Sequence, residues 1–566
     1  MWAITLNPGF VCILAGLLML AAPRSLRAPS MAITALIALW LLLDHDFGAA
    51  SAVAQMGLPV VLLDLDALNR IFGIAALIAL IALSIFANAR PNRYEDAAIL
   101  MMAGGAVSAL FVGDLVSFVA SAALAGLAAA WIVFCSPLDE ARRTGVRLLV
   151  WNGLEGLLLL VGVAFHLSAG AEGTVFARLD INTIGGGCIF AALMIRIGAP
   201  LAHVWLKDTV AHASPLGGAA LSAFSTLVGV YALARFFPAE PLLIPIGAAM
   251  IVIGALYAAS VDDLRAGGAY GLMTQTGMCV ALIGVGSPLA VAAAEGHIFT
   301  SMFVFLALQM ALGAVLERRG AVRLSQFEGL ARAMPVTSFL ILITGLAAAG
   351  MPGLALYATH SVALEASAQW DLRWLWALMA GGSAVLFVSL ALRPALAANR
   401  NGARLEKFNE APFSMLLGAG VAAFFCISIG LAPAWLYGLM PTVLTFAPFE
   451  MDRVAPQLEL LGAAGAAFIL LRALGLAPKE RAVDLRDIDA LYRGPVAGAA
   501  RWAGVVMLRV YGAWGAAISS LAARGASALA AWTQSCDTPY LGRGWAALQF
   551  WAIAGLAALV LIGARL

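Results

Sequence analysis

Ionisable side chains stand out in this sequence because the residues around them are mostly apolar. Glu155 lies inside the apolar run NGLEGLLLL (152–160), and His297 and His360 lie in two further apolar segments. One stretch between two apolar segments carries five such groups: Arg196, His203, Lys207, Asp208 and His212. A charge inside a membrane costs about 2.5–3.5 kcal/mol on insertion scales, so these groups are expected to serve a function.

The cysteines give no sign of a bound cofactor. They are scattered singly and no CxxC motif occurs, so local motifs for iron–sulfur, zinc or haem attachment are not supported. We expect no cofactor and no metal in this chain, and we interpret the cysteines as small core residues. No redox or hydrolytic motif is present either, so any oxidoreductase activity would belong to a larger complex.

The composition identifies an integral membrane protein. Of the 566 residues, 63% are hydrophobic and 11% are charged, whereas a soluble domain is about 45–50% apolar and about 25% charged. This excludes a disordered chain, a collagen, a disulfide scaffold and a secreted enzyme. The net charge is +2 and no long basic run occurs, so nucleic-acid binding has no support.

The elements that must position these groups are membrane-spanning helices, each needing about 20 apolar residues. The first lacks a basic n-region and is predicted to be a retained span rather than a signal peptide. The predicted fold is an all-α polytopic membrane protein with about sixteen spans, at 8–23, 30–47, 69–88, 96–112, 115–135, 148–168, 183–202, 214–236, 241–260, 269–287, 297–316, 336–350, 374–392, 413–432, 457–476 and 545–563.

Basic loops predict the orientation of these spans. Arg24 and Arg27 follow the first span, and Arg142, Arg143 and Arg147 follow the fifth. The other basic loops also follow odd-numbered spans, and such loops are normally cytoplasmic. Both termini are therefore expected outside the cytoplasm.

Three segments do not fit a simple span. Residues 50–66 alternate apolar and acidic side chains after Pro59 and predict a small hairpin outside the membrane. Residues 350–366 are interrupted by glycine and proline and predict a broken or re-entrant helix. The polar stretch 196–217 predicts a second break.

Residues 496–533 predict an amphipathic helix along the cytoplasmic membrane surface, about 57 Å long at about 1.5 Å per residue. The alternative is another span. Pro495 precedes the segment and Pro539 follows it. Five polar side chains fall within one arc of about 140° on this helix: Arg501, Arg509, Ser520, Arg524 and Ser527.

The stretch HVWLKDTVAHASPLGGAALSAFSTLVGVYALARFF (203–237) resembles the signature of the antiporter-like membrane subunits. These are the proton-pumping subunits of complex I, the large subunits of Mrp cation/proton antiporters and their hydrogenase relatives. Further matches are DDLRAGGAYGLMTQTGM (262–278), EGHIF (295–299), LGAVLERRG (312–320), GLARAMPVTSFLILITGLAAAGMPG (329–353) and LRDIDALYRGP (485–495). The resemblance covers roughly residues 60–400 well and the remainder by layout.

The resemblance implies two inverted five-helix repeats, each with a discontinuous helix, and a lateral helix before the last span. It implies N-terminal spans with the hairpin, a first repeat, a second repeat, C-terminal spans, a linker with the lateral helix, and a final span. The corresponding boundaries are 1–95, 96–236, 241–392, 393–476, 477–544 and 545–566.

The resemblance also implies a row of ionisable groups at mid-membrane, and this chain departs from that row. The first-half glutamate falls at Ala123, the first-half lysine at Leu227 and the central lysine at Phe305. A second histidine falls at Ser301, and the last lysine is replaced by His360. Most relay positions have thus lost their charge. By contrast, a chemically similar group is retained at Arg196, His203, Asp208 and His297, and Lys207 stands where the family has proline.

Each ion-path candidate has a plainer interpretation. Glu155 either replaces the lost glutamate or is a polar group that meets a neighbouring subunit or an arginine. His203, Lys207 and Asp208 serve either proton uptake or helix capping and interfaces. His297 and His360 either carry protons or are merely hydrogen-bonded.

The acidic and basic residues after the ninth span have a separate interpretation. Asp262, Asp263 and Arg265 are expected to form ion pairs in a cytoplasmic loop.

Two hypotheses for function follow. In the first, the chain is a membrane subunit of a complex-I-like or Mrp-like assembly and conducts protons or cations. In the second, it is a structural scaffold subunit that no longer translocates ions. Both imply the cytoplasmic (inner) membrane of a bacterium, lipid contact, and partners among antiporter-like and small membrane subunits.

Overall fold

The computed structural model describes residues 6–55, 58–169, 175–400, 409–442, 444–476, 488 and 492–535. The chain forms two compact units, Met1–Leu485 and Arg486–Leu566.

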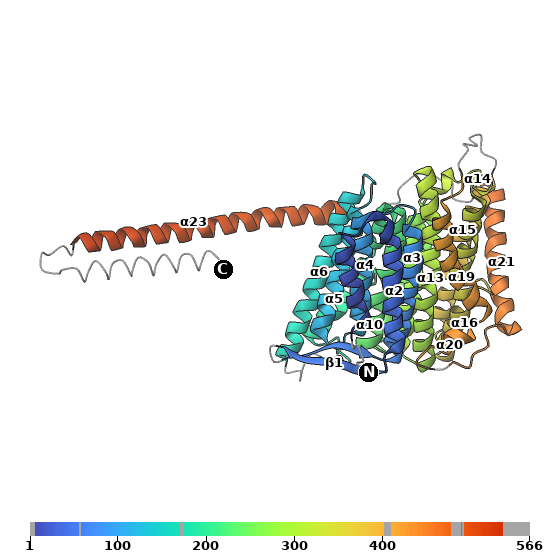
Figure 1. The fold of residues 1–566 in the computed structure, drawn as a ribbon, viewed down its shortest axis with the longest axis horizontal. Coiled ribbons are helices and arrows are strands. Elements are labelled where there is room, and N and C mark those ends of the chain that lie inside the picture. The colour runs from blue at the N-terminus through green and yellow to red at the C-terminus, as the bar shows by residue number, and fades with distance from the viewer. Residues whose placement is uncertain are drawn as a thin grey trace. The chain divides into compact units, whose positions relative to one another are not determined.

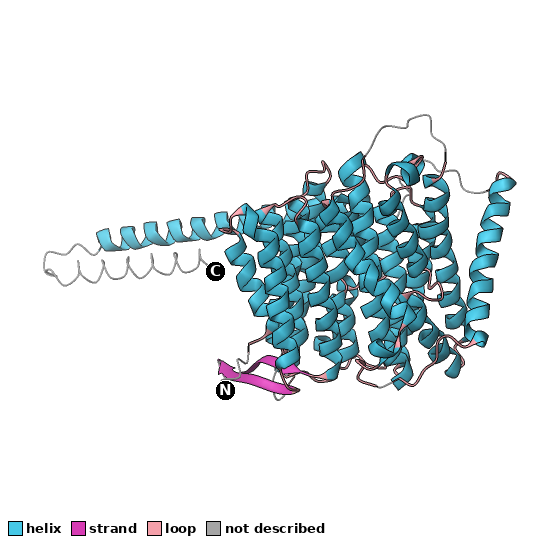
Figure 2. Ribbon diagram, turned by 45° about the vertical axis from the view of Figure 1, so that its right-hand side comes forward, coloured by secondary structure: helices cyan, strands magenta, loops and turns pink. Residues whose placement is uncertain are grey.

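The first unit is a bundle of helices that lie side by side (Figures 1 and 2). A two-stranded hairpin covers one end of it, called here the hairpin end. The opposite end, which carries the basic loops that begin with Arg24 and Arg142, is called the basic end. The elements of its first part are α1 (Pro8–Met19), η1 (Arg24–Leu26), α2 (Arg27–Asp44), β1 (Gly48–Gln55), β2 (Leu58–Leu65), α3 (Ala67–Ala87), α4 (Arg93–Phe111), α5 (Leu115–Phe134), α6 (Ala141–Ser168), α7 (Ile184–Arg196), α8 (Val204–His212), α9 (Pro215–Phe224) and α10 (Leu227–Phe236).

The second part of this unit continues the bundle. Its elements are α11 (Leu243–Ser260), α12 (Leu264–Val285), α13 (Pro288–Arg319), η2 (Leu324–Gln326), α14 (Leu330–Ala333), α15 (Pro335–Ala348), α16 (Ala355–Gln369), α17 (Arg373–Leu386), the π-helical η3 (Phe387–Leu392), α18 (Arg393–Ala398), α19 (Phe413–Leu431), α20 (Ala434–Tyr437) and α21 (Met451–Ala473).

The first fifteen predicted spans each coincide with one or more helices of this unit. Among the described residues, 13 helices are long and apolar enough to cross a membrane, and three shorter apolar helices accompany them. The sixteenth predicted span, 545–563, lies outside the described residues. The prediction of an almost entirely helical membrane protein is confirmed.

The hairpin predicted within 50–66 is present. Strands β1 and β2 pair antiparallel, from Gly48 opposite Leu65 to Gln55 opposite Leu58. Asp114 fixes the hairpin to the bundle, because its carboxylate caps α5 through Ser117 N–H and also accepts the Val61 N–H at 2.9 Å.

Three long segments form the buried centre of the bundle, and His297 lies on one of them. The spans Pro215–Phe236, Leu264–Val285 and Pro288–Arg319 are buried along their whole apolar length. Helices α11 and α12 approach so closely that a Cβ added at Gly247 would lie 2.4 Å from the carbonyl oxygen of Gly277. Small residues allow such contacts between membrane helices.

Both predicted breaks occur. Helix α7 ends at Arg196 and α8 begins at Val204, with Gly198 at φ +68° between them. Helix α15 ends at Ala348 and α16 begins at Ala355, with Gly350 and Gly353 at φ +67° and +88°. Only the first part of the predicted segment 350–366 is irregular, because the left-handed glycines interrupt the helix locally and α16 resumes after them.

The second unit contains η4 (Tyr492–Val496) and α23 (Ala497–Ser535). The predicted helix at 496–533 is therefore present. Its window 501–528 is also long and apolar enough to cross a membrane, so its placement along the surface stays a prediction. Most of the linker before it lies outside the described residues.

Candidate functional site

The first buried polar cluster is an ion pair between α6 and the end of α7. Arg196 Nε lies 2.6 Å from Glu155 Oε1, and only 8% and 3% of the two side chains are exposed. Arg196 Nη2 also donates to the carbonyl oxygen of Ala122 at 2.8 Å. The expectation that Glu155 either replaces the lost glutamate or meets an arginine is thus resolved in part. It meets an arginine of its own chain, and that arginine also binds the carbonyl of Ala122, the residue before Ala123.

The space around this pair is tight. A cavity of about 10 Å³, which is about the volume that holds one water, lies between the pair and side chains that include Met102, Asn152 and Ser225. A Cβ added at Gly229 of α10 would lie 2.8 Å from Arg196 Cγ, so the glycine makes room for the arginine.

The polar residues after the first break tie α8 to α6. Asp208 Oδ2 lies 3.0 Å from Arg147 Nη1, and Lys207 Nζ lies 3.9 Å from Asp208 Oδ1. His212 Nδ1 is 2.9 Å from Thr144 Oγ1. These contacts agree with the interface interpretation of Lys207 and Asp208.

His203, a further candidate at this break, occupies the N-cap of α8. Its ring lies beside the stacked rings of Tyr257 and Tyr270, with centroids 6.4 and 6.2 Å away. It thus connects the first break to α11 and α12, which carry the two tyrosines.

The expectation of loop ion pairs after the ninth span is wrong for Arg265. Its guanidinium is fully buried and donates to the carbonyl oxygens of Ala211, Ala213 and Ser214, at 2.8–3.0 Å, where α8 ends and α9 begins. Asp263 instead caps α12 through its backbone N–H groups. The arginine is drawn inward because helix C-termini present unsatisfied carbonyls.

The neighbouring Asp262 also makes no ion pair of the expected kind. It accepts the backbone N–H and the hydroxyl of Ser325 at 2.9 and 2.8 Å. Arg265 and Asp262 thus tie this part of the chain to two other segments, the α8–α9 junction and η2.

The second buried cluster surrounds the break after α15. His297 Nε2 lies 2.7 Å from Gln275 Oε1, and His297 Nδ1 lies 3.0 Å from Thr359 Oγ1. Gln275 Nε2 donates to the carbonyl oxygen of Ala348 at 2.8 Å. Thr300 Oγ1 lies 3.0 Å from Thr359 Oγ1 and extends the chain of hydrogen bonds.

His360 is the second imidazole of this cluster. Its ring centroid lies 6.3 Å from that of His297, and its Nε2 lies 3.2 Å from Ser383 Oγ. Its Nδ1 is buried and has no hydrogen-bond partner among the described residues. This nitrogen is therefore not committed to a hydrogen bond with another described group.

A cavity of about 680 Å³ between α16, α17 and α21 reaches His360; we call it the α16–α21 cavity. Glu365, Asp452, Arg453 and Glu459 also line it. At its inner side Gln457 of α21 donates to the carbonyl oxygen of Gly350 at 3.1 Å. Water or a small ion that entered this cavity would come near the side chain of His360.

The relay positions that lost their charge separate the two clusters. Leu227, Ser301 and Phe305 are all buried, and no hydrogen bond between described residues joins the Glu155–Arg196 pair to His297 or His360. In the part of the chain that the structure describes, no group of three or more His, Cys, Asp or Glu side chains could hold a metal ion.

Sequence reasoning did not identify the amides and hydroxyls of the second cluster. Gln275 lies within the quoted motif at 262–278, and Thr359 directly precedes His360. In each case a polar residue inside an apolar run was the sequence signal that could have indicated a buried hydrogen-bonding group.

Comparison with known proteins places this geometry in a family. Residues 112–386 match the family model described as NADH:quinone oxidoreductase/Mrp antiporter, TM. A probable K⁺/H⁺ antiporter component of Rhizobium meliloti is 27% identical over 300 residues, which make up 50% of this chain and 30% of that protein. This region is thus similar to the antiporter-like membrane subunits.

The antiporter-like fold extends beyond the matched region. A chain in the structure of the Mrp complex from Dietzia sp. has a TM-score of 0.74 at 22% identity, covering 92% of this chain and 62% of that one. A chain of respiratory complex I from Thermus thermophilus has a TM-score of 0.69 at 21% identity, covering 81% of this chain and 100% of that one. The chain thus shares its fold with membrane chains of these two assemblies over most of its length.

Proposed function

We propose that this chain conducts protons as one membrane subunit of a hetero-oligomeric assembly of the Mrp or complex I kind. The buried ion pair of Glu155 and Arg196 carries the proposal. The arginine of this pair also binds the carbonyl of Ala122, the residue before Ala123, where the resemblance implies a lost glutamate. The Glu155 carboxylate can take up a proton, whereas the guanidinium of Arg196 keeps its charge throughout.

The second half supplies imidazoles for the same purpose. His360 has a free Nδ1 and borders the α16–α21 cavity of about 680 Å³. A neutral imidazole can accept a proton at one nitrogen and release one from the other. Water in the cavity supplies the partner that His360 lacks within the described protein.

The Glu155–Arg196 pair acts as a charge switch. When Glu155 gains a proton, its attraction to Arg196 falls, and the Ala122 carbonyl still holds the guanidinium. When the proton leaves, the pair forms again. The charge of the cluster thus alternates between +1 and zero, with no other ionisable group required at Leu227.

The test uses the assembly purified through a tag on this chain and reconstituted into liposomes that contain a pH-sensitive dye. A potassium diffusion potential drives proton flux. We expect Glu155→Gln and His360→Ala each to lower the flux at least tenfold. Glu317→Gln and His166→Ala are the matched controls, because Glu317 pairs with an exposed arginine and His166 lies near the end of α6.

The scaffold alternative makes the opposite prediction. Wild-type assembly with no more flux than empty liposomes would overturn the proposal and favour a structural role. Wild-type flux that survives both substitutions would show that protons take another route. Relatives named as antiporter and oxidoreductase subunits favour the conducting function.

We also infer stable association with other membrane subunits, because the two polar clusters of this chain are not joined to each other. The partners are antiporter-like or small membrane subunits in the inner membrane of a bacterium, with both termini of this chain outside the cytoplasm. Cross-linking in native membranes, followed by identification of the linked chains, tests this. Recovery of a fully active monomer without cross-linked partners would contradict it.

Helix α23 is proposed to lie along the cytoplasmic membrane surface. Its 39 residues make a helix about 58 Å long, whereas the hydrocarbon layer is about 30 Å thick. Single cysteines along the helix should then react with a polar maleimide at every third or fourth position. A continuous protected block of about 20 residues would show a span instead.

A further inference from the structure

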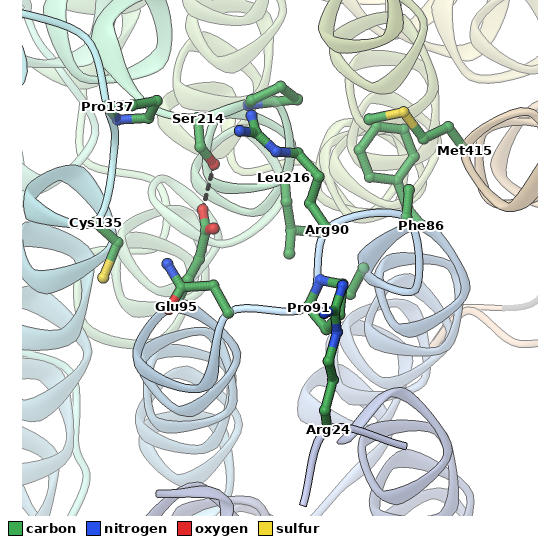
Figure 3. Close-up of a pocket in the computed structure, with 14 residues that line it drawn as sticks. Arg24, Phe86, Arg90, Pro91, Glu95, Cys135, Pro137, Ser214, Leu216 and Met415 are labelled. Carbon is green, nitrogen blue, oxygen red and sulfur yellow. Dashed lines mark hydrogen bonds between the residues drawn. The ribbon is translucent and has the colours of Figure 1, made fainter. Parts of the chain in front are cut away.

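A second cavity lies at the basic end of the first unit, near the starts of α4 and α9 (Figure 3). Its volume is about 380 Å³, and we call it the α4–α9 cavity. Its lining includes Arg24 of η1, Arg90 before α4, Glu95 of α4, Cys135 after α5 and Ser214 before α9. It thus joins polar groups from five separate parts of the chain.

Glu95 is the buried carboxyl group of this cavity, with 5% of the residue exposed. Figure 3 shows its carboxylate pointing at the hydroxyl of Ser214, which donates a short hydrogen bond to Oε1. Ser214 Oγ also accepts the N–H of Gly217 at 2.8 Å as the N-cap of α9. The single hydroxyl proton of Ser214 is therefore directed at Glu95, and Glu95 accepts it.

Asp96, the next residue on α4, is a second buried carboxyl group near this cavity. It is 1% exposed, and neither of its carboxyl oxygens has a hydrogen-bond partner in the described parts of the chain. Two buried carboxyl groups close in sequence rarely both keep their charge, so at least one of them is expected to hold a proton. The other groups facing Glu95 are the lining residues Arg24, Arg90, Cys135 and Ser214.

Helix α4 leads from Glu95 to the first polar cluster. Met102 is seven residues after Glu95 on α4, which places it on the same helix face about 10 Å along the axis. Met102 lines the 10 Å³ cavity beside Glu155. One face of α4 therefore borders both the cavity that Glu95 lines and the cavity that Glu155 lines.

Helix α9 forms a second wall along the same direction. Ser214 caps its start, and Ser225 follows its end. The hydroxyl of Ser225 is buried without a hydrogen-bond partner among the described residues, and Ser225 lines the cavity beside Glu155. Both α4 and α9 therefore run from the α4–α9 cavity to the Glu155–Arg196 pair, and a polar group marks each end of α9.

We propose that Glu95 is the group through which protons pass from solution at the basic end to Glu155. A carboxylate oxygen of Glu95 forms an O–H bond with a proton delivered by water in the α4–α9 cavity. That bond breaks as the proton passes, through water between α4 and α9, to the carboxylate of Glu155. Arg196 keeps its charge, and solution restores the proton of the cavity water.

This proposal rests on the proposed function, but it concerns a different part of the chain. The family model matches residues 112–386, so Glu95, Asp96 and both arginines of the cavity lie before the matched region. The α4–α9 cavity is built largely from segments that the family model does not describe.

The test exploits the difference in size between the two cavities. Glu95→Ala should lower proton flux of the reconstituted assembly at least tenfold, and added formate should restore a substantial part of it. Formic acid fits a space of about 380 Å³ and can carry the proton in place of Glu95. Glu155→Ala should lose flux equally but gain little from formate, because the cavity of about 10 Å³ beside it is too narrow to admit formate from solution to the vacated space. Glu317→Ala is the control carboxyl substitution.

Two further measurements separate a proton-carrying role from a structural one. Glu95→Gln preserves the side-chain volume, and its residual flux should lose the dependence on pH at the basic end. Cys135 lines the same cavity, so a membrane-impermeant maleimide applied from that end should label it in wild type and in both Glu95 variants. Labelling that is unchanged in the variants shows that the cavity is intact.

The outcomes distinguish this inference from the function on which it rests. Loss of flux in Glu155→Ala with normal flux in Glu95→Ala would overturn the role of Glu95 and leave the proposed function standing. A Glu95→Ala assembly that formate does not rescue, with Cys135 still labelled, would also overturn it. Absence of wild-type flux would overturn both.

Discussion

Gln275 of α12 and His297 of α13 share a hydrogen bond of 2.7 Å whose direction is set by the backbone. The amide nitrogen of Gln275 donates to the carbonyl oxygen of Ala348, so its oxygen faces the imidazole. His297 Nε2 must therefore carry the hydrogen, and Nδ1 must accept one from Thr359 Oγ1. The break after α15 thus selects one tautomer of a buried histidine.

This arrangement predicts the protonation pattern of His297. Nitrogen-15 NMR of histidine-labelled protein should show a protonated Nε2 and an unprotonated Nδ1 at neutral pH. In Gln275→Glu, one carboxylate oxygen faces His297 and the other faces the carbonyl oxygen of Ala348, to which it cannot donate. Because a nearby negative charge favours the cationic imidazole, we expect His297 to be doubly protonated in this variant. The partly exposed His166 serves as the reference signal. A protonated Nδ1 in the wild type would contradict the assignment.

A double-mutant cycle should reveal strong coupling between Glu155 and Arg196. Glu155→Leu or Arg196→Leu alone should cost about 3–5 kcal/mol of unfolding free energy, because each leaves one uncompensated buried charge. The double substitution should cost much less than the sum of the two. Unfolding in mixed micelles measures all three variants.

The matched control for this cycle is an exposed ion pair. Arg90 and Glu317 are 3.0 Å apart, with 56% and 21% of their side chains exposed. Their coupling energy should be about 0–1 kcal/mol. Additive effects at Glu155 and Arg196 would mean that the two charges do not depend on each other.

Gly218 should be intolerant of alanine because of Arg265. A Cβ added there would lie 2.0 Å from Arg265 Nη2. The guanidinium would have to leave at least one of the three carbonyls that it holds between α8 and α9. We expect a loss of about 1–3 kcal/mol, measured as a lower midpoint of thermal unfolding in detergent.

The control for this substitution is another helical glycine. A Cβ at Gly153 of α6 would meet nothing within 4 Å. Gly153→Ala should therefore leave the midpoint unchanged or raise it slightly, because alanine favours helix more than glycine does. Equal losses at the two sites would rule out the role of Arg265.

The hairpin should contribute a pH-dependent term to stability through Asp64. Burial raises the pKa of Asp64 above its ordinary value of 3.8, the carboxyl of Asp66 raises it further, and Arg235 opposes both. The folded state thus binds this proton more tightly than the unfolded state. Stability from this group is fully present below pH 3.8 and is lost as the pH rises through the raised value.

Replacing Asp64 removes that dependence. Asp64→Asn should raise the unfolding midpoint at about pH 7, and the difference from wild type should shrink toward about pH 4. Asp139→Asn, at an exposed loop position, is the control. A difference that stays constant with pH would show that the titration of Asp64 is not responsible.

Local sequence signals predicted the positions of helices, breaks and hairpin well. Apolar runs mark membrane helices because each segment that crosses the hydrocarbon layer must itself be long and apolar enough to do so. Gly198 and Gly350 mark the breaks because they adopt positive φ. These features need no knowledge of the neighbouring helices.

Pairings between helices could not be predicted in the same way. Glu155 and Arg196 are 41 residues apart, and their meeting depends on how α6 and α7 rotate against each other. In a membrane the lipid-facing and the buried side chains are both apolar, so periodicity does not reveal that rotation. Arg265 illustrates the same limit, because a loop position and a buried position have the same sequence pattern.

The break after α15 has a consequence for the response to membrane voltage. Its carbonyls are covered by the side-chain amides of Gln275 and Gln457, which carry no net charge. Voltage does work of about 2.3 kcal/mol per elementary charge per 100 mV, and only on charge that moves. While Glu155 remains paired with Arg196 and the histidines remain neutral, neither cluster has a net charge. An arriving proton is then what couples this chain to the electric field.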